Sequence, residues 1–244
     1  MGSVLKVRYL IKYTKGSNIK FVAHLDLMRT IQRTFKRSNL PVEYSKGFNP
    51  HMKLSIAQPL SVGVYSDGEY LDIDFYEAVD EEEIKERFNA FSTEDIKLIK
   101  VVKVNDLYEK SGKKIPQAMA ALDGASYEIK IKYKNTNKLE EEIKEIKERK
   151  EWNIVKKTKN SEKEVNIKPM VKSFITFVKG DYLEVKALVS CGSRENLSAD
   201  LLSEYIKSNT SNLEQFAFTE IKREDLYGLK GEALVPLWEY FKSK

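Results

Sequence analysis

Apolar and polar residues alternate in several stretches of the first hundred residues, and apolar residues recur at helical spacing in two others. "VLKVRYLIKY" alternates and is rich in β-branched and aromatic residues, which favours a strand. "EYLDIDF" also alternates and places Leu71, Ile73 and Phe75 on one face, with Asp72 and Asp74 on the other. The predicted elements are a strand within 4–13, a helix over 24–38, a strand, loop and strand over 40–56, a strand over 69–75, a helix over 80–91 and a strand over 95–104.

We interpret this order as β-α-β-β-α-β, the split-βαβ or ferredoxin-like arrangement, and the second half of the chain repeats it. Its predicted elements are a strand over 126–134, a helix over 137–150, short strands over 152–158 and 165–171, a hairpin over 173–189, a helix over 198–208 and a closing strand over 214–223. "GEYLDI" at 68–73 also returns as "GDYLEV" at 180–185. We therefore predict an α+β chain of two tandem ferredoxin-like domains from a divergent internal duplication. These domains are residues 1–104 and 125–244, joined by a connecting segment over 105–124.

Composition excludes several classes of protein. Charged residues make up 32% of the chain, and no run of 18 apolar residues is present, so we expect no membrane span. The single cysteine, Cys191, cannot form an internal disulfide, which favours a reducing cytoplasm. The sequence has no Walker loop, no dinucleotide-binding fingerprint and no three-cysteine cluster motif, so we expect no bound cofactor.

Charge is distributed unevenly, and the first 53 residues are strongly basic. They hold 11 lysines and arginines against two acids, whereas residues 54–95 hold two against 12. On the predicted helix, Arg29, Arg33 and Arg37 fall on one stripe with Asp26, and Lys36 lies beside it. We expect the opposite side to be core and to contain Leu25, Met28, Ile31 and Phe35. Stacked arginines repel one another but suit phosphate oxygens, so the stripe is either a phosphate-binding face or a solvated basic face.

The loop that follows combines bases, aromatic residues and one of the chain's two histidines. Aromatic rings interleaved with cations suit stacking on unpaired nucleotides, and Gly47 permits close backbone approach. For Tyr44 and Phe48 we expect at least one ring to pack against the sheet instead. The candidate nucleic-acid-binding residues are Arg29, Arg33, Lys36 and Arg37 on the helix, His24 and Asp26 at its start, and Tyr44, Ser45, Lys46, Gly47, Phe48, His51 and Lys53 in the loop.

Other chemistry for the same residues receives less support from their spacing. Two histidines could act as general acid and base for RNA cleavage, but nothing in the spacing brings His24 and His51 together. A metal site at His24, Asp26 and His51 would rest on a weak H-x-D signal. Cys191 lies in "VSCGS", which has no recognisable catalytic context. We therefore assign no catalytic residue and no metal ligand.

Three stretches between residues 21 and 73 together resemble a known family. "FVAHLDLMR", "LPVEYSKGFNPHMKLSIAQPLSVGV" and "EYLDI" are similar to the radical SAM-linked, or radical SAM-associated, bacterial proteins of uncharacterised function. The resemblance implies a setting in RNA metabolism and a radical SAM protein as partner, and it supplies no catalytic residues. The duplicated architecture also resembles tandem ferredoxin-like CRISPR RNA endonucleases, although "LYGLKGEALVP" lacks the glycine-rich loop of that group.

Our leading hypothesis is a cytoplasmic RNA-binding accessory protein that delivers ribosomal or transfer RNA to a radical SAM enzyme. The first alternative is a metal-independent endoribonuclease. The second alternative is a protein–protein adaptor whose basic face meets an acidic partner and which binds no RNA.

Overall fold

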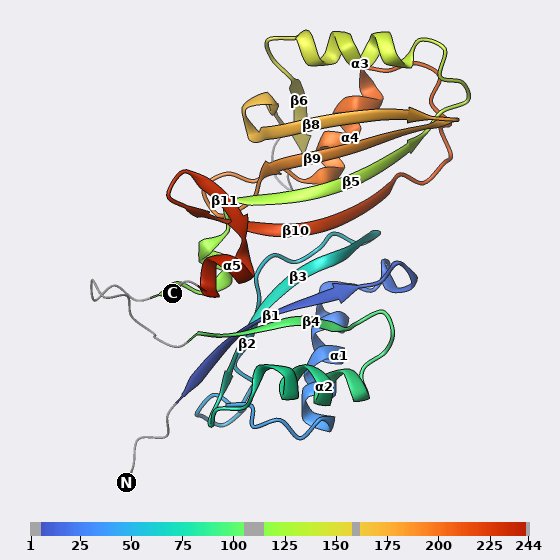
Figure 1. The fold of residues 1–244 in the computed structure, drawn as a ribbon. Helices are drawn as coiled ribbons and strands as arrows, with labels where there is room; N and C mark the ends of the chain where they lie inside the picture. The colour runs from blue at the N-terminus through green and yellow to red at the C-terminus, as the bar shows by residue number, and fades with distance from the viewer. Residues whose placement is uncertain (1–5, 105–114, 158–161, 243–244) are drawn as a thin grey trace. The chain divides into compact units, whose positions relative to one another are not determined.

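The computed structural model describes residues 6–104, 115–157 and 162–242 (Figure 1). It has a mixed α+β fold divided into two compact units. The first unit comprises Met1–Asp123 and Asp225–Lys244, and the second comprises Gly124–Glu224. Residues 225–244, which the sequence placed in the C-terminal domain, thus group with the first unit. Of the expected connecting segment, residues 105–114 lie outside the described residues.

The first unit contains an antiparallel sheet in the order β4-β1-β3, with the short β2 paired to β3. The elements are β1 (Val7–Lys15), the 3-10 turn η1 (Ser17–Ile19), α1 (His24–Arg37), β2 (Leu54–Ile56), β3 (Val64–Phe75), α2 (Glu81–Phe91) and β4 (Leu98–Val104). Most of these elements overlap the stretches predicted for them, but β3 begins five residues before the predicted 69–75 and η1 was not predicted. The strand expected from residue 40 is present only as isolated bridges at Val42 and Tyr44. The side chain of Asp80 caps α2 by accepting from the amides of Glu82 and Glu83, and three glutamates follow in its first turn.

One face of this sheet and the inner sides of α1 and α2 form the core. Leu71, Ile73 and Phe75 are fully buried in it, as their alternation predicted. The prediction for Leu25 was wrong: its side chain is 61% exposed, and Leu27 is buried instead. The two positions are separated by about 200° around the helix. Once Ile31 and Phe35 face the sheet, Leu27 therefore joins them and Leu25 points away. Met28 is partly buried at the margin.

The opposite face of the same sheet is also covered. The 3-10 turn η2 (Ala118–Ala121) packs on β3, and α5 (Leu237–Lys242) packs on β1 and β4. Asp72 is consequently only 3% exposed. One of its carboxylate oxygens accepts a hydrogen bond from the amide of Ala118 at 2.7 Å. A charged side chain thus lies inside the first unit.

The second unit has the sheet order β5-β9-β8 and a separate β6-β7 hairpin, all antiparallel. Its elements are β5 (Gly124–Lys132), α3 (Leu139–Glu148), β6 (Asn153–Lys157), β7 (Glu162–Asn166), η3 (Lys168–Met170), β8 (Val171–Lys179), β9 (Tyr182–Ser190) and α4 (Ala199–Ser208). Cys191 is buried in this unit. No helix in the described ranges is long and apolar enough to cross a membrane.

The end of the chain differs from the prediction. The closing strand was expected over 214–223, but β10 covers Glu220–Lys230 and passes from the second unit into the first. The stretch before it is a loop in which Asn212 adopts a left-handed conformation, with φ of 59°. Phe216 in this loop is 96% exposed. β11 (Ala233–Pro236), which pairs with β10, and α5 were not predicted.

Candidate functional site

Residues 43–53 of the first unit form a small antiparallel hairpin, which we call the basic hairpin. Tyr44 and Met52 face each other as a β-bridge. The amide of Ser45 donates to the carbonyl of His51 at 2.8 Å, and the amide of Lys53 donates to the carbonyl of Glu43 at 2.9 Å. Residues 46–50 therefore form a short loop whose two ends are held together.

The side chains of Ser45 and His51 close this loop a second time. The Ser45 hydroxyl lies 2.8 Å from Nδ1 of His51 and accepts from the His51 amide at 3.0 Å. When the hydroxyl donates to Nδ1, the imidazole proton resides on Nε2. His51 is exposed, so Nε2 is then a donor available to a ligand. Ser45 therefore closes the loop and also orients the imidazole ring of His51.

The tip of the basic hairpin carries an aromatic ring that packs on nothing. The relative exposure of Phe48 is 107%, and that of Tyr44 is 42%. We expected at least one of the two rings to pack against the sheet: Phe48 does not, whereas Tyr44 is partly covered. Gly47 precedes Phe48 with φ of 129°, a conformation that residues with a side chain rarely adopt. Lys46 is exposed beside them and has no ionic or hydrogen-bonding partner in the described ranges.

The arginine stripe of α1 is exposed as its helical angles predicted, but its members differ in their partners. Arg29 pairs with Asp26 at 3.0 Å, and Arg37 donates to the carbonyl of Phe91 at 3.3 Å. The side chains of Arg33 and Lys36 form no hydrogen bond or ion pair with any described residue. Two cations on this face are thus fully available, and two are partly engaged.

The sequence-predicted residues form two groups rather than one pocket. α1 and the basic hairpin share a core, since Ile31 and Met52 belong to the same cluster. No hydrogen bond or ion pair links the exposed residues of the two elements within the described chain, and none joins His24 to His51. His24 is half-buried at the start of α1. Among the described residues, no three His, Cys, Asp or Glu side chains are grouped to hold a metal ion.

The base of the basic hairpin leads to charged residues that the sequence analysis missed. The amide of Glu43 donates to the carbonyl of Asp74 at 2.8 Å, and the amide of Asp74 donates to the carbonyl of Lys53 at 3.0 Å. Glu43 pairs with Lys53 at 3.2 Å and with Lys6 at 3.3 Å. The hydrogen bond from Lys53 holds the pKa of Glu43 below its ordinary value.

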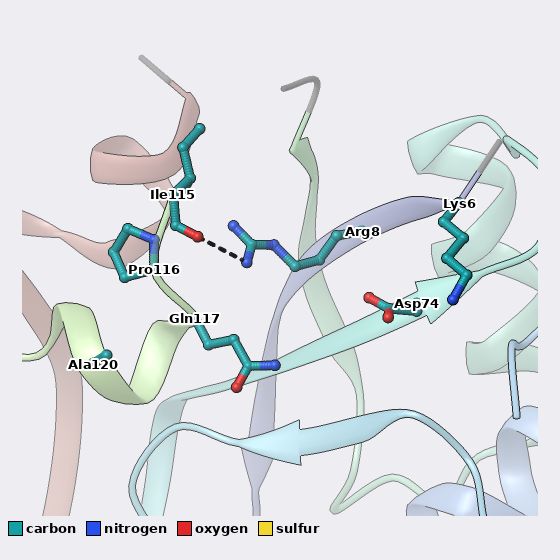
Figure 2. Close-up of a pocket in the computed structure, with 7 residues that line it drawn as sticks. All are labelled: Lys6, Arg8, Asp74, Ile115, Pro116, Gln117 and Ala120. Atoms are coloured by element: carbon teal, nitrogen blue, oxygen red, sulfur yellow. Dashed lines mark hydrogen bonds between the residues drawn. The ribbon is translucent and has the colours of Figure 1, made fainter. Parts of the chain in front are cut away.

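Beside this base lies a cavity of about 560 Å³, which we call the Arg8 pocket (Figure 2). It is lined by Lys6, Arg8, Asp74, Ile115, Pro116, Gln117 and Ala120. Arg8 on β1 and Asp74 on β3 are directly opposite each other in the strand register, so their side chains emerge on the same face. Figure 2 shows the segment from Ile115 to Ala120 on the other side of the pocket.

Arg8 is 5% exposed, yet its guanidinium is only partly satisfied. Nη1 donates to the carbonyl of Ile115 at 3.3 Å. Nε lies 3.8 Å from Oδ1 of Asp72, which is close enough for attraction but not for a hydrogen bond. Within the described ranges, Nη2 and Nε have no hydrogen-bond partner, and neither does that carboxylate oxygen. Because a buried donor without a partner is costly, Arg8 stands out among the residues of this unit.

The carboxylates that face Arg8 titrate abnormally. Burial raises the pKa of Asp72 to about 6, although the Ala118 hydrogen bond and the Arg8 charge oppose the change. Burial also raises the pKa of Asp74, against the opposing charge of Lys53. No clear signal for this site was present in the sequence, because Arg8 falls on the polar phase of an alternating strand that also contains Lys12. Its covering residues come from a segment without periodicity, so the pocket itself could not be inferred.

Comparison with known proteins places the chain in a family. A family model described as "Uncharacterized protein conserved in bacteria (DUF2344)" matches residues 8–199. The chain belongs to this family. The match begins at Arg8 and includes α1, the basic hairpin and the residues of the pocket from Ile115 to Ala120. No curated protein matches the chain.

Among solved structures, the chain is similar to one titled "Crystal Structure of an Unknown Protein from Galdieria sulphuraria". The two are 10% identical over 92% of this chain and 99% of that chain, with a TM-score of 0.26.

Proposed function

We propose that the first unit binds single-stranded RNA through the basic hairpin and the exposed face of α1. The observation that carries this proposal is the fully exposed ring of Phe48 at the tip of a loop held by Ser45 and His51. A phenyl ring in water gains nothing from packing, whereas a base stacked on it stabilises a complex by about 1–3 kcal/mol. Lys46 and His51 place cationic and donor groups on the same loop.

The phosphate contacts in this proposal come mainly from α1. Arg33 and Lys36 have no partner in the described chain, so an RNA phosphate need not displace one. Arg29 would have to share its guanidinium with Asp26, and Arg37 with the Phe91 carbonyl. Arg33 and Lys36 therefore carry most of the salt-dependent affinity.

We further propose the context that the resemblance supplies. In that context, the protein is an accessory that delivers ribosomal or transfer RNA to a radical SAM enzyme.

We also propose that the α+β fold consists of two ferredoxin-like domains that arose from one duplication. The support for this proposal is the repeated order of strands and helices, and the position of the two sequence echoes, which lie in β3 and at the start of β9.

Fluorescence anisotropy with a labelled single-stranded 12-nucleotide RNA tests the binding proposal. Phe48→Ala should weaken binding about tenfold, while Phe216→Ala, an equally exposed ring in the second unit, should leave it unchanged. Arg33→Ala/Lys36→Ala should lower the slope of log affinity against log salt by about 1.4. Lys150→Ala/Lys172→Ala, which removes two exposed lysines of the second unit, is the charge-matched control.

Equal loss in the matched controls would refute the assigned surface, and no binding by the wild-type chain would refute the function. The same RNA is examined for fragments after incubation. Cleavage that disappears in His51→Ala would replace the accessory role with the endoribonuclease alternative.

A further inference from the structure

The Arg8 pocket offers hydrogen-bonding groups of both kinds in one space. On the donor side, Nη2 of Arg8 is buried and has no hydrogen-bond partner among the described residues. On the acceptor side, the carboxylate of Asp74 forms no hydrogen bond or ion pair with a described residue. The Gln117 amide, which extends from the covering segment in Figure 2, can donate or accept. A ligand that fits must accept from Arg8 and donate to Asp74.

The charges in and beside the pocket favour a ligand without net charge. They balance one another: Lys6, Arg8 and Lys53 are cationic, and Glu43, Asp72 and Asp74 are anionic. A phosphate or carboxylate would leave this group with an excess of negative charge close to Asp74. A neutral, polar molecule keeps the balance and still satisfies Nη2.

The walls and size of the pocket are compatible with a nucleobase. Ile115, Pro116 and Ala120 supply apolar surface, and about 560 Å³ is within the ordinary range of small-molecule sites. Apolar walls with a few polar groups at the edge are the usual surroundings of a base taken out of its stack.

The pocket lies next to the base of the basic hairpin. The main chain of Asp74 is hydrogen-bonded to both strands of this hairpin, through Glu43 and Lys53, and Asp74 also lines the pocket. An RNA strand that extends from the tip of the hairpin to its base would therefore bring a neighbouring nucleotide to the pocket.

We propose that the Arg8 pocket receives an unpaired guanine base of the bound RNA, an inference that rests on the proposed function. Guanine presents two adjacent donors, N1–H and the N2 amino group, which match the two oxygens of the Asp74 carboxylate. Its O6 and N7 are acceptors for Nη2 of Arg8. Adenine and cytosine instead place an acceptor beside their amino group, and that acceptor would face the carboxylate.

Nine-nucleotide oligouridylates with one central substitution test the base preference. The wild-type chain should bind the guanosine oligonucleotide about tenfold more tightly than the adenosine one, with the inosine one between them because inosine lacks the N2 donors. Asp74→Asn keeps the shape of the side chain but places a donor where an acceptor is required. It should abolish the preference of the wild-type chain for guanosine over adenosine. Asp181→Asn, at an exposed turn of the second unit, is the matched control.

The outcomes separate the two proposals. Uridylate binding without any preference for guanosine overturns the pocket inference and leaves the RNA-binding function intact. No binding to any oligonucleotide overturns both. NMR titration with guanosine locates the bound base independently. We expect chemical-shift changes at the Gln117 side-chain amide and at the Ile115 methyl groups. Guanosine shifts confined to other residues would also overturn the inference.

Discussion

Replacement of Asp72 by Asn should change how the stability of the first unit depends on pH. Asp72 is buried, and its pKa is raised from an ordinary 3.8 to about 6. The folded chain therefore holds this proton more tightly than the unfolded chain. The resulting stabilisation is fully present below about pH 3.8 and is lost as the pH rises through about 6. At about 1.4 kcal/mol per pKa unit, the loss is about 3 kcal/mol.

In Asp72→Asn this titration is absent, and the amide oxygen can still accept from Ala118. The difference in unfolding free energy, wild type minus variant, should fall by about 3 kcal/mol between pH 3.5 and pH 7.5. Urea denaturation at several pH values measures it. The chain has two tryptophans, one in each unit. In a Trp152→Phe background, the fluorescence of Trp238 therefore reports on the first unit.

Parallel pH curves for wild type and variant would refute the reasoning, because they would mean that Asp72 titrates normally in the folded chain. A difference that rises with pH would show that the attraction of Arg8 outweighs burial. Asp181→Asn, at an exposed position, should give a curve parallel to the wild type.

Three further changes test other parts of the structure. Ile31→Ala should lower the free energy of unfolding by about 3 kcal/mol in urea denaturation, whereas Leu25→Ala should change it by less than about 0.5 kcal/mol. Equal effects would contradict the finding that Ile31 lies on the buried side of α1 and Leu25 on the exposed side. Asp80→Ala should cost about 1 kcal/mol through loss of the cap of α2, and Asp80→Asn should recover most of it. Phe48→Ala should leave the thermal midpoint within about 1 °C of the wild type, since its ring has no packing to lose; a lower midpoint would show that the ring supports the fold.

The main strands and helices within residues 6–104 were predictable because each carries its own periodicity. Leu71, Ile73 and Phe75 alternate with acids, and the apolar residues of α1 recur at helical spacing. This spacing did not fully determine which side of α1 faces the sheet, since Leu25 and Leu27 both extend an apolar stripe. Packing against the sheet decides between them, and that packing depends on strands distant in sequence.

The basic hairpin was identified from composition, but the exposure of Phe48 was not, because an aromatic residue in a loop more often packs than projects. The Arg8 pocket was missed for another reason. Its charged wall comes from β1 and β3 and its cover from residues 115–120, a stretch with no regular pattern. Only the fold shows that the acidic face of β3 is buried beneath that stretch.

Photo-crosslinking shows whether RNA binds at the basic hairpin. A 4-thiouridine RNA is irradiated with the wild-type chain, and the nucleotide-bearing tryptic peptides are identified by mass spectrometry. Trypsin cleaves after Lys46 and Lys53, so the tip of the hairpin is released as Gly47–Lys53. We expect this peptide to carry the principal adduct, and we expect salt that weakens binding to remove that adduct. Adducts confined to peptides of the second unit would contradict it.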